Sequence, residues 1–373
     1  AKAAKDGAGL DRVLVLPTGN PPHKHDVTPA EDRWRMVCAA VAQQDGLEPC
    51  RMEMDRTGVI YTVDTLKILH EMYPRADFHY IIGADTLLDL KNWRHYEQVL
   101  GMCSFLICPR LGASQPAEVT EERHRLTAMG GSFSSVDMDV VDVSSTQVRR
   151  ELSQGRPTPG LPVVCREYAG LCGLYGMRPR LNRPQAWLEK LFRDLTAKRF
   201  SHTLAVAHTA RHLANLHGVD AHKAEEAAVL HDCAKCLPVK EMQCICRQQH
   251  LTEDEQVLSS GALMHSLVGA YLAAEEYGEQ DPDVLRAIAC HTTGKVGMTR
   301  LDMVVYLADK IEPTRESYPT LEKVRMLAQL NLERALLASM EGTRAFVRKG
   351  GKPLHPQTLE TMAWLKESIK TGT

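Results

Sequence analysis

The chain has 373 residues, which exceeds the usual size of one hydrophobic core and therefore predicts two domains. Its formal net charge of −2 excludes a general electrostatic attraction to nucleic acid or acidic membranes, so a polyanionic ligand must be bound by a local site. Its 11 scattered cysteines, with no signal peptide and no apolar run of membrane length, predict a reduced cytoplasmic protein without disulfides or a membrane anchor.

The chain begins at Ala1, inside what the pattern predicts to be the end of a helix before a buried strand at 13–16. A natural chain normally begins with Met and with a whole element. We therefore expect the sequence to be a fragment that lacks its true N-terminus.

The first 110 residues alternate between short apolar runs and longer helical patterns. RVLVL, FHYIIG and SFLICP predict buried strands, and patterns such as AEDRWRMVCAAVAQQ and TVDTLKILHEMY predict helices. Strands joined by helices favour a Rossmann-like α/β nucleotidyltransferase domain with a parallel sheet. Gly, Pro or Asp follows each run at the carboxyl end of the strand, the edge where such sheets bind nucleotides.

The composition changes after Met177, where RPRLNRPQAW places two prolines among basic and polar residues. From residue 187 onward, apolar positions recur at helical spacing, as in TLAVAHTARHLANLHG and HSLVGAYLAAEEYG, and strand patterns are almost absent. The sequence predicts an α/β domain over 1–178, a linker over 179–186 and an all-α domain over 187–373.

Six ionisable side chains lie in the apolar helical runs of the second half rather than on solvated faces. Burying so many such groups without partners would cost several kcal/mol each, and a shared metal centre removes that cost. Imidazoles and carboxylates in this ratio can hold two divalent cations, and metal pairs commonly perform phosphoryl chemistry. The candidate ligands are His202, His231, Asp232, His265, His291 and Asp309.

A single histidine on an apolar helix face is more often a hydrogen-bonded core residue than a metal ligand. The six candidates differ because they follow the order H, HD, H, H, D, in which the chain resembles the HD-domain metal-dependent phosphohydrolases. RFSHTLAVA, LHDCAKCLP, MHSLVGA, AIACHTTG and YLADKIEPTRE further resemble the HD-type symmetrical bis(5′-nucleosyl)-tetraphosphatases of bacteria. We assign the other histidines of this half to the core or the surface: His208, His212, His217, His222 and His250.

The resemblance to the symmetrical tetraphosphatases implies a di-iron site that cleaves diadenosine tetraphosphate into two ADP molecules. Mixed nitrogen and oxygen ligands also suit manganese, cobalt or zinc, and ligand type alone does not choose among these metals. The resemblance implies that Asp232 bridges the two metals. It assigns His202, His231 and Asp309 to the first metal, and His265 and His291 to the second.

Several groups near these ligands are candidates for binding substrate phosphates. Lys235 follows Asp232 by three residues, so on a continued helix it would lie on nearly the same face and act with Asp232 in catalysis. The turn Thr292-Thr293-Gly294 could direct backbone N–H groups at the phosphates. The other phosphate candidates are Arg199, Lys295 and Arg315. Each of these cations, including Lys235, is equally well explained as an ordinary surface residue.

Cys233 and Cys236 form a C-x-x-C pair, with Cys244 and Cys246 nearby, which could indicate a zinc or redox motif. We expect the pair to lie on the helix that carries Asp232, whereas structural zinc sites need turns at their cysteine pairs. We therefore favour small buried hydrophobic residues over metal ligands.

Residues 13–178 resemble the bacterial nicotinate-nucleotide adenylyltransferases in VLPTGNPPHK, GVIYTVDTL, HYIIGADTLLDLKNW and VDVSSTQVRREL. The resemblance implies transfer of the AMP part of ATP, with Mg²⁺, to nicotinate mononucleotide. Two helix starts offer N–H groups to phosphates, a strand ending in Gly83 and Asp85 suits a ribose, and Trp93 offers an aromatic face to a pyridine ring. The candidates are Thr62, Asp64, Thr65, Gly83, Asp85, Trp93, Ser144, Ser145, Thr146 and Arg149.

The catalytic signature of that family, a Gly-rich turn followed by H-x-G-H, is expected upstream of Ala1. TGNPPHKHD (18–26) imitates it but lacks the second Gly-His, so we do not assign His23 as the catalytic histidine. We expect adenylyl transfer by this fragment to be weak or absent, because groups that stabilise the pentavalent phosphorus are missing.

The sequence thus predicts a bifunctional nucleotide enzyme whose ligands are diadenosine tetraphosphate, ATP and nicotinate mononucleotide. Two alternatives stay open: the HD site acts on another nucleotide, or the chain is a nucleotide sensor without turnover. The near-neutral charge and the lack of a basic, aromatic patch disfavour nucleic acid as a partner. Formation of a homodimer is left open.

Overall fold

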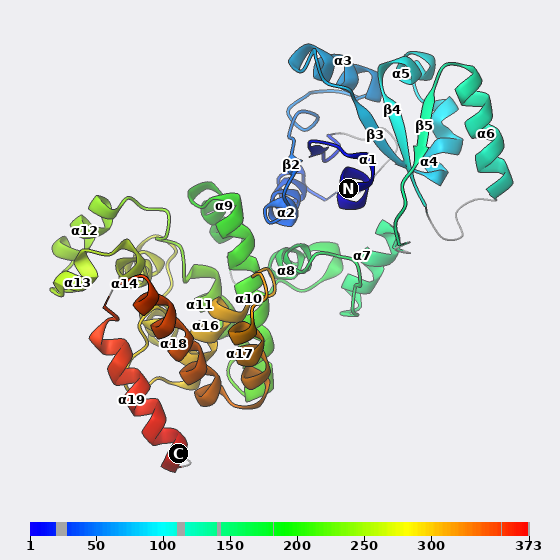
Figure 1. Cartoon of the computed structure of the whole chain (residues 1–373). Helices are drawn as coiled ribbons and strands as arrows, with labels where there is room; N and C mark the ends of the chain where they lie inside the picture. The colour runs from blue at the N-terminus through cyan, green and yellow to red at the C-terminus, as the bar shows by residue number, and fades with distance from the viewer. Residues whose placement is uncertain (20–27, 110–115, 140–142, 182, 352, 372–373) are drawn as a thin grey trace. The chain divides into compact units, whose positions relative to one another are not determined.

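The computed structural model describes residues 1–19, 28–109, 116–139, 143–181, 183–351 and 353–371. The chain forms two compact units, Ala1–Leu161 and Pro162–Thr373 (Figure 1). Strands occur in the first unit, and the described part of the second unit is helical.

The first unit contains only parallel strand pairs within its described residues. β1 (Val13–Val15) pairs with β2 (Leu47–Pro49) in one sheet. In the other, β4 (Ser104–Cys108) lies between β3 (His79–Gly83) and β5 (Ser132–Ser135), as Figure 1 shows. The predicted α/β fold with parallel strands is confirmed.

The core of the first unit is built from β-sheet side chains and the helices that connect the strands. Phe105 of β4 is fully buried and stacks on Phe133 of β5, with ring centroids 5.0 Å apart. The helices are α1 (Lys2–Ala8), α2 (Ala30–Val41), α3 (Thr62–Met72), α4 (Ala84–Asp89), η1 (Leu90–Asn92), α5 (Tyr96–Met102), α6 (Pro116–Ala128) and α7 (Ser145–Ser153).

The second unit is a set of packed helices, in agreement with the predicted all-α domain. No helix in the described part of the chain is both long and apolar enough to cross a membrane. The elements are α8 (Val163–Cys172), η2 (Leu174–Gly176), α9 (Pro184–Asp194), α10 (Ala197–His217), α11 (Ala221–Leu230), α12 (Val239–Gln248), α13 (Glu255–Leu258), α14 (Gly261–Glu275), α15 (Pro282–Cys290), α16 (Arg300–Ile311), α17 (Pro319–Leu330), α18 (Leu332–Lys349) and α19 (Pro356–Thr371).

Local sequence signals fix the ends of the central helices. The Thr196 hydroxyl accepts a hydrogen bond from Arg199 N at the start of α10, and Gly218 ends this helix in the left-handed conformation, at φ 67°. Thr299 and Asp302 form a reciprocal capping box at the start of α16. The two helices that carry His202 and Asp309 therefore begin at defined residues.

The compact units divide earlier in the chain than the predicted domain limits. Helix α8 belongs to the second unit, where Arg180 holds it through an ion pair of 2.6 Å with Glu167. Residues 162–178 thus pack with the helical unit, although the resemblance assigned them to the α/β domain. The domain limits that the sequence predicts stay a prediction: 1–178, 179–186 and 187–373.

Candidate metal centre

The six predicted ligands come together in the helical unit, although they are spread over more than 100 residues of sequence. Two groups of three residues place their donor atoms within 4.8 Å of one another. Asp232 belongs to both groups, the first with His202 and His231, the second with His265 and His291. Within the described residues these are the groups that could hold a metal ion, and neither contains a cysteine.

The two carboxylate oxygens of Asp232 face different groups. Its Oδ2 lies 3.8 Å from His231 Nε2. Its Oδ1 lies 3.2 Å from His265 Nε2 and 3.9 Å from His291 Nε2. One carboxylate is therefore shared between the two groups, as a bridging ligand would be.

Asp309 completes the first group. Its Oδ1 lies 3.1 Å from His202 Nε2 and 4.0 Å from His231 Nε2. Burial alone would raise the pKa of Asp309, but Lys310, at 2.8 Å, and His202 hold it well below its usual value. The carboxylate is ionised and can act as a metal ligand.

Backbone carbonyls orient two of the imidazoles. His231 Nδ1 donates to Ala228 O at 2.6 Å, and His291 Nδ1 donates to Ile288 O at 2.7 Å. With the proton on Nδ1, the lone pair of each Nε2 points into the centre. Burial lowers the pKa of both histidines, which favours the neutral form that binds metals.

The buried donor atoms fit a pair of cations. His231 Nε2 and Asp232 Oδ1 are buried without a hydrogen-bond partner, and the Nε2 atoms of His265 and His291 lie 3.0 Å apart. Unpartnered acceptors in a buried site are costly unless a cation meets them. Burial alone would raise the pKa of Asp232, but the neighbouring His231 and His265 hold it well below its usual value.

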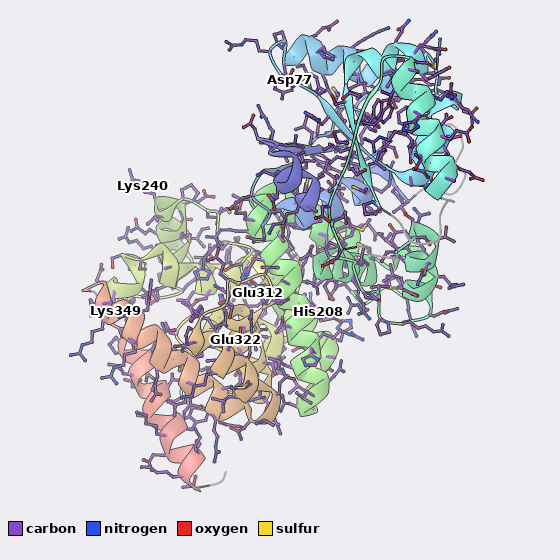
Figure 2. All side chains as sticks on the ribbon, turned by 45° about the vertical axis from the view of Figure 1, so that its right-hand side comes forward. Asp77, His208, Lys240, Glu312, Glu322 and Lys349 are labelled. Carbon is purple, nitrogen blue, oxygen red and sulfur yellow. The ribbon has the colours of Figure 1, made fainter. Side chains whose placement is uncertain are left out.

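Glu312 is a member of the site that the sequence interpretation missed. Glu312, which Figure 2 labels, is 1% exposed, and its Oε1 lies 3.1 Å from His202 Nδ1. Thr314 N–H donates to the other carboxylate oxygen at 2.6 Å and fixes the group in place. The spacing of three residues from Asp309, within ADKIEPTR, is the signal that could have found it. Glu312 is placed to orient His202 from behind.

Three of the predicted cations lie against the ligand carboxylates. Arg199 Nη1 is 3.3 Å from Asp232 Oδ2, and Arg315 Nη2 is 3.0 Å from Asp309 Oδ1. Lys235 Nζ lies 3.4 Å from Asp232 Oδ1 and 2.8 Å from His265 Nε2. Burial lowers the pKa of Lys235 despite these carboxylates. Positive charge is therefore concentrated at the edge of the centre.

The expected helix through Lys235 is wrong. Helix α11 ends at Leu230, and residues 231–236 form consecutive turns in which Lys235 N donates to Asp232 O at 2.9 Å. The turn, rather than a helix face, brings Lys235 beside Asp232.

The C-x-x-C pair also lies in these turns and not on a helix. Cys233 is buried, with its Sγ 3.4 Å from Gly269 O on α14, and Cys236 is exposed. A Cβ at Gly269 would lie 3.4 Å from His231 O, in ordinary van der Waals contact, so α14 packs close enough to this turn to leave room for no more than a methyl group. All 11 cysteines are free thiols.

One of the backbone N–H groups in the turn after His291 already has a partner within the fold. Gly294 N donates to Cys290 O at 2.9 Å, and Gly294 O accepts from Gln357 Nε2 at 2.7 Å. The Gly294 N–H is therefore not available to substrate, which corrects the expectation. Thr292 Oγ1 is buried without a partner, whereas Thr293 Oγ1 donates to Gly294 O. Within the described contacts, no ion pair joins the half-buried Lys295 to a ligand.

The histidines assigned to the core or surface lie outside both metal groups. His208 faces Glu167, His212 contacts Gln329, His217 contacts Ala328 O, His222 faces Glu226, and His250 has a left-handed backbone.

The first mononucleotide candidates open a helix as predicted. Thr62 begins α3, with Tyr61 at its N-cap, and Asp64 lies in the first turn. Thr65 is already engaged, because its hydroxyl donates to Glu53 at 2.9 Å. Thr62 also forms a side-chain hydrogen bond with Tyr80, so both threonine hydroxyls at this helix start already have a partner.

The remaining candidates of the α/β unit lie at element boundaries. Gly83 ends β3, but Asp85 lies inside α4 rather than at the strand end. Trp93 is half-buried and packs edge-on against Tyr80. Ser144 caps α7 by accepting from Gln147 N at 3.1 Å, so Ser145, Thr146 and Arg149 lie within this helix and not before it. His23 lies outside the described residues.

Comparison with known proteins agrees with this division. The HD domain model matches residues 199–314, and the Cytidylyltransferase-like model matches residues 1–151. A symmetrical bis(5′-nucleosyl)-tetraphosphatase of Bacillus subtilis is 43% identical over 189 residues, which are 50% of this chain and 98% of that protein. A probable nicotinate-nucleotide adenylyltransferase of Desulfitobacterium hafniense is 37% identical over 179 residues, 47% of this chain and 86% of that protein. The chain belongs to both families.

The two families also occur joined in a single relative. A protein of Mycoplasma genitalium named probable nicotinate-nucleotide adenylyltransferase/Ap4A hydrolase is 26% identical over 356 residues, 93% of each chain. The combination of an adenylyltransferase unit with an HD tetraphosphatase unit is therefore not peculiar to this chain.

Proposed function

We propose that the chain is a bifunctional nucleotide enzyme. Its HD unit hydrolyses diadenosine tetraphosphate symmetrically to two ADP, and its α/β unit transfers the adenylyl group of ATP to nicotinate mononucleotide. The names of the relatives in both families, and of the fused relative, support this pairing. The cytoplasmic setting stays a prediction from composition.

The position of Asp232 carries the proposal for the HD unit. Its two oxygens face two histidine groups, so the buried cluster suits two cations better than one. Two bound divalent cations would supply an activated water and Lewis acidity at phosphorus. Iron is our first choice because of the family, and manganese, cobalt or zinc suit the same donors.

The surrounding cations would bind the polyphosphate. Arg199 and Arg315 each place one nitrogen on a ligand carboxylate, and their side chains are 39% and 38% exposed. Their remaining N–H groups can therefore bind phosphate oxygens on the solvent side of the centre. Lys235 lies closer in, at 25% exposure, where it can neutralise charge that develops on the central phosphates.

The α/β unit would hold its nucleotides at helix N-termini. Thr62 and Asp64 at the start of α3 suit the mononucleotide, and the exposed Ser145 and Thr146 in the first turn of α7 suit phosphates of ATP. Mg²⁺ would accompany the ATP. These assignments rest on the resemblance and on the position of the elements.

The products of hydrolysis test the HD proposal. Purified full chain, loaded with each metal in turn, is incubated with diadenosine tetraphosphate, and nucleotides are separated by chromatography. We expect ADP alone and no turnover by Asp232→Ala. ATP plus AMP, or activity that survives Asp232→Ala, would contradict it.

A nucleotide panel distinguishes the alternatives. Comparison of kcat/KM for diadenosine tetraphosphate, nucleoside di- and triphosphates and cyclic dinucleotides identifies the preferred substrate. A sensor would bind nucleotides and turn over none of them. Its metal content, measured on the same preparation, would also lack a bound transition metal.

Pyrophosphate release tests the α/β unit. Full chain with ATP, Mg²⁺ and nicotinate mononucleotide should release pyrophosphate at most slowly, as expected above, and more slowly still after Arg149→Ala, since this arginine lies on α7 beside the proposed phosphate site. An unchanged rate would argue against that site, and absence of any release from the unaltered chain would argue against transfer by this unit.

A further inference from the structure

A second cavity lies in the helical unit, outside the metal centre. Its volume is about 340 Å³, and it is lined by the segment 178–181 together with side chains of α10 and α11. We call it the arginine pocket. Its charged lining residues are Arg178, Arg180, Arg211, His222 and Glu225.

The floor of the arginine pocket is a neutralised ion-pair network. Glu225 is fully buried, with one oxygen 2.6 Å from Arg180 Nη1 and the other 2.7 Å from Arg211 Nη1. The second η nitrogen of Arg180 lies 2.6 Å from the buried Glu167. Glu167 in turn faces His208 of α10, which Figure 2 labels. Two arginines are thus balanced by two glutamates.

This network leaves positive charge and donors unused. Arg178 is exposed, and in the described part of the chain no ion pair is formed by it. Arg211 donates through Nη1 and is 39% exposed, so its other guanidinium N–H groups are open to a ligand. The pocket therefore has one cation more than its carboxylates balance.

We propose that the arginine pocket binds a small phosphorylated molecule through its phosphate group. Arginine forks match phosphate oxygens in charge and geometry. A volume of about 340 Å³ lies at the small end of ligand pockets, which start near 300 Å³, and suits a nucleoside monophosphate better than a bare ion.

The site is separate from hydrolysis. None of its lining residues is a proposed metal ligand or one of the cations at the metal centre. A ligand bound here would contact α10 and α11, the helices that carry His202 and lead to His231. The proposal adds a binding site to the proposed function and does not depend on it.

Titration calorimetry on the full chain tests the proposal, with AMP, inorganic phosphate and adenosine as separate probes. We expect saturable binding of AMP, weaker binding of phosphate and no competition by adenosine. Arg178→Ala and Arg211→Gln should each weaken AMP binding about tenfold, the loss of one charged hydrogen bond. Arg348→Ala, an exposed arginine on α18, is the matched control and should bind normally.

Two results would overturn the proposal. One is the absence of any AMP or phosphate binding that the pocket substitutions reduce. The other is that adenosine competes for the pocket as strongly as AMP binds to it, which would show that the pocket does not recognise the phosphate. Hydrolysis of diadenosine tetraphosphate without AMP should be unchanged in Arg178→Ala, which would show that the variant is folded.

Discussion

Glu312 lies directly behind His202, with its carboxylate oxygen 3.1 Å from the Nδ1 of the imidazole. The opposite nitrogen of the same ring faces Asp309. Because the carboxylate fixes the proton on Nδ1 and orients the ring, we expect Glu312→Ala to weaken metal binding about 10- to 100-fold.

Competition with a chelator, followed by metal analysis, measures this effect. Glu312→Gln keeps an acceptor and should lose less. The exposed Glu322 on α17, labelled with Glu312 in Figure 2, supplies the control Glu322→Gln, which should hold metal normally. Equal retention by Glu312→Ala would contradict an orienting role.

Asp232 should matter to both metals, and His291 to one. Asp232→Asn should lose most of both cations, because Asp232 alone belongs to both groups. His291→Ala should retain about one cation per chain. Metal content per chain, with folding checked by circular dichroism, measures the difference. Equal loss in the two variants would contradict a bridging position.

Lys235 should affect turnover more than metal binding. Its ammonium lies 2.8 Å from His265 Nε2, where it competes with a cation for the same lone pair. Lys235→Met should therefore hold metal at least as well as the unaltered chain. Its kcat should fall about 100- to 1000-fold, as when a preorganised charge-stabilising donor is removed. If Lys235→Met lost bound metal and activity to the same extent, the role of Lys235 would be to hold the metal site together and not to assist turnover.

The stability of the metal-free chain should depend on pH through His202. Burial alone would lower the pKa of His202, but its hydrogen bonds to Asp309 and Glu312 raise it from 6.5 to about 9. A raised folded pKa adds stability that is fully present below pH 6.5 and is lost as pH rises through 9. The loss should be about 3 kcal/mol.

Urea denaturation of chelator-treated protein between pH 6 and 9.5, compared with His202→Gln, isolates this contribution. The pKa values of His231 and His291 are shifted in the opposite direction, because burial lowers them, so they do not produce a loss of this sign. Identical pH profiles for the two proteins would refute the prediction.

Gly294 and Gly297 form a matched pair for stability. Both have left-handed backbones, at φ 70° and φ 74°. A Cβ at Gly294 would lie 2.6 Å from the Met340 side chain and 2.9 Å from that of Thr361, whereas nothing lies within 4 Å at Gly297.

Gly297→Ala should therefore cost about 1–2 kcal/mol of unfolding free energy from backbone strain alone. Gly294→Ala should cost about 1–3 kcal/mol more, because the side chains of Met340 and Thr361 must shift. Thermal denaturation of the two variants measures the difference, and equal losses would mean that these side chains move aside freely.

The ligands could be predicted from the sequence because each is a polar residue inside an apolar helical run. Their grouping in space came only from the family resemblance and not from the spacing, since His202 and Asp309 meet across 107 residues. Glu312 was missed although its spacing of three residues from Asp309 places it near the ligands, because that spacing does not show that it faces His202. Recognition of such a partner requires the packing of α10 against α16.

The turn after α11 is the main local error. VLHDCAKC contains no Gly or Pro, so its pattern favours a continued helix. The structure ends the helix at Leu230. The domain limit differs for another reason: α8 is held to the helical unit through the buried Glu167, whose partners Arg180 and His208 lie 13 and 41 residues further along the chain.

Gly269 has no donor atom, yet it sets a dimension of the site. It lies one helical turn after His265 on α14, where a Cβ would meet the backbone oxygen of His231 at 3.4 Å and a longer side chain would press against it. A residue larger than alanine would therefore act as a spacer that moves His265 away from Asp232. The distance between these two donor groups, and with it the span of polyphosphate that the proposed two-metal site would accept, is adjustable from a position that carries no ligand atom.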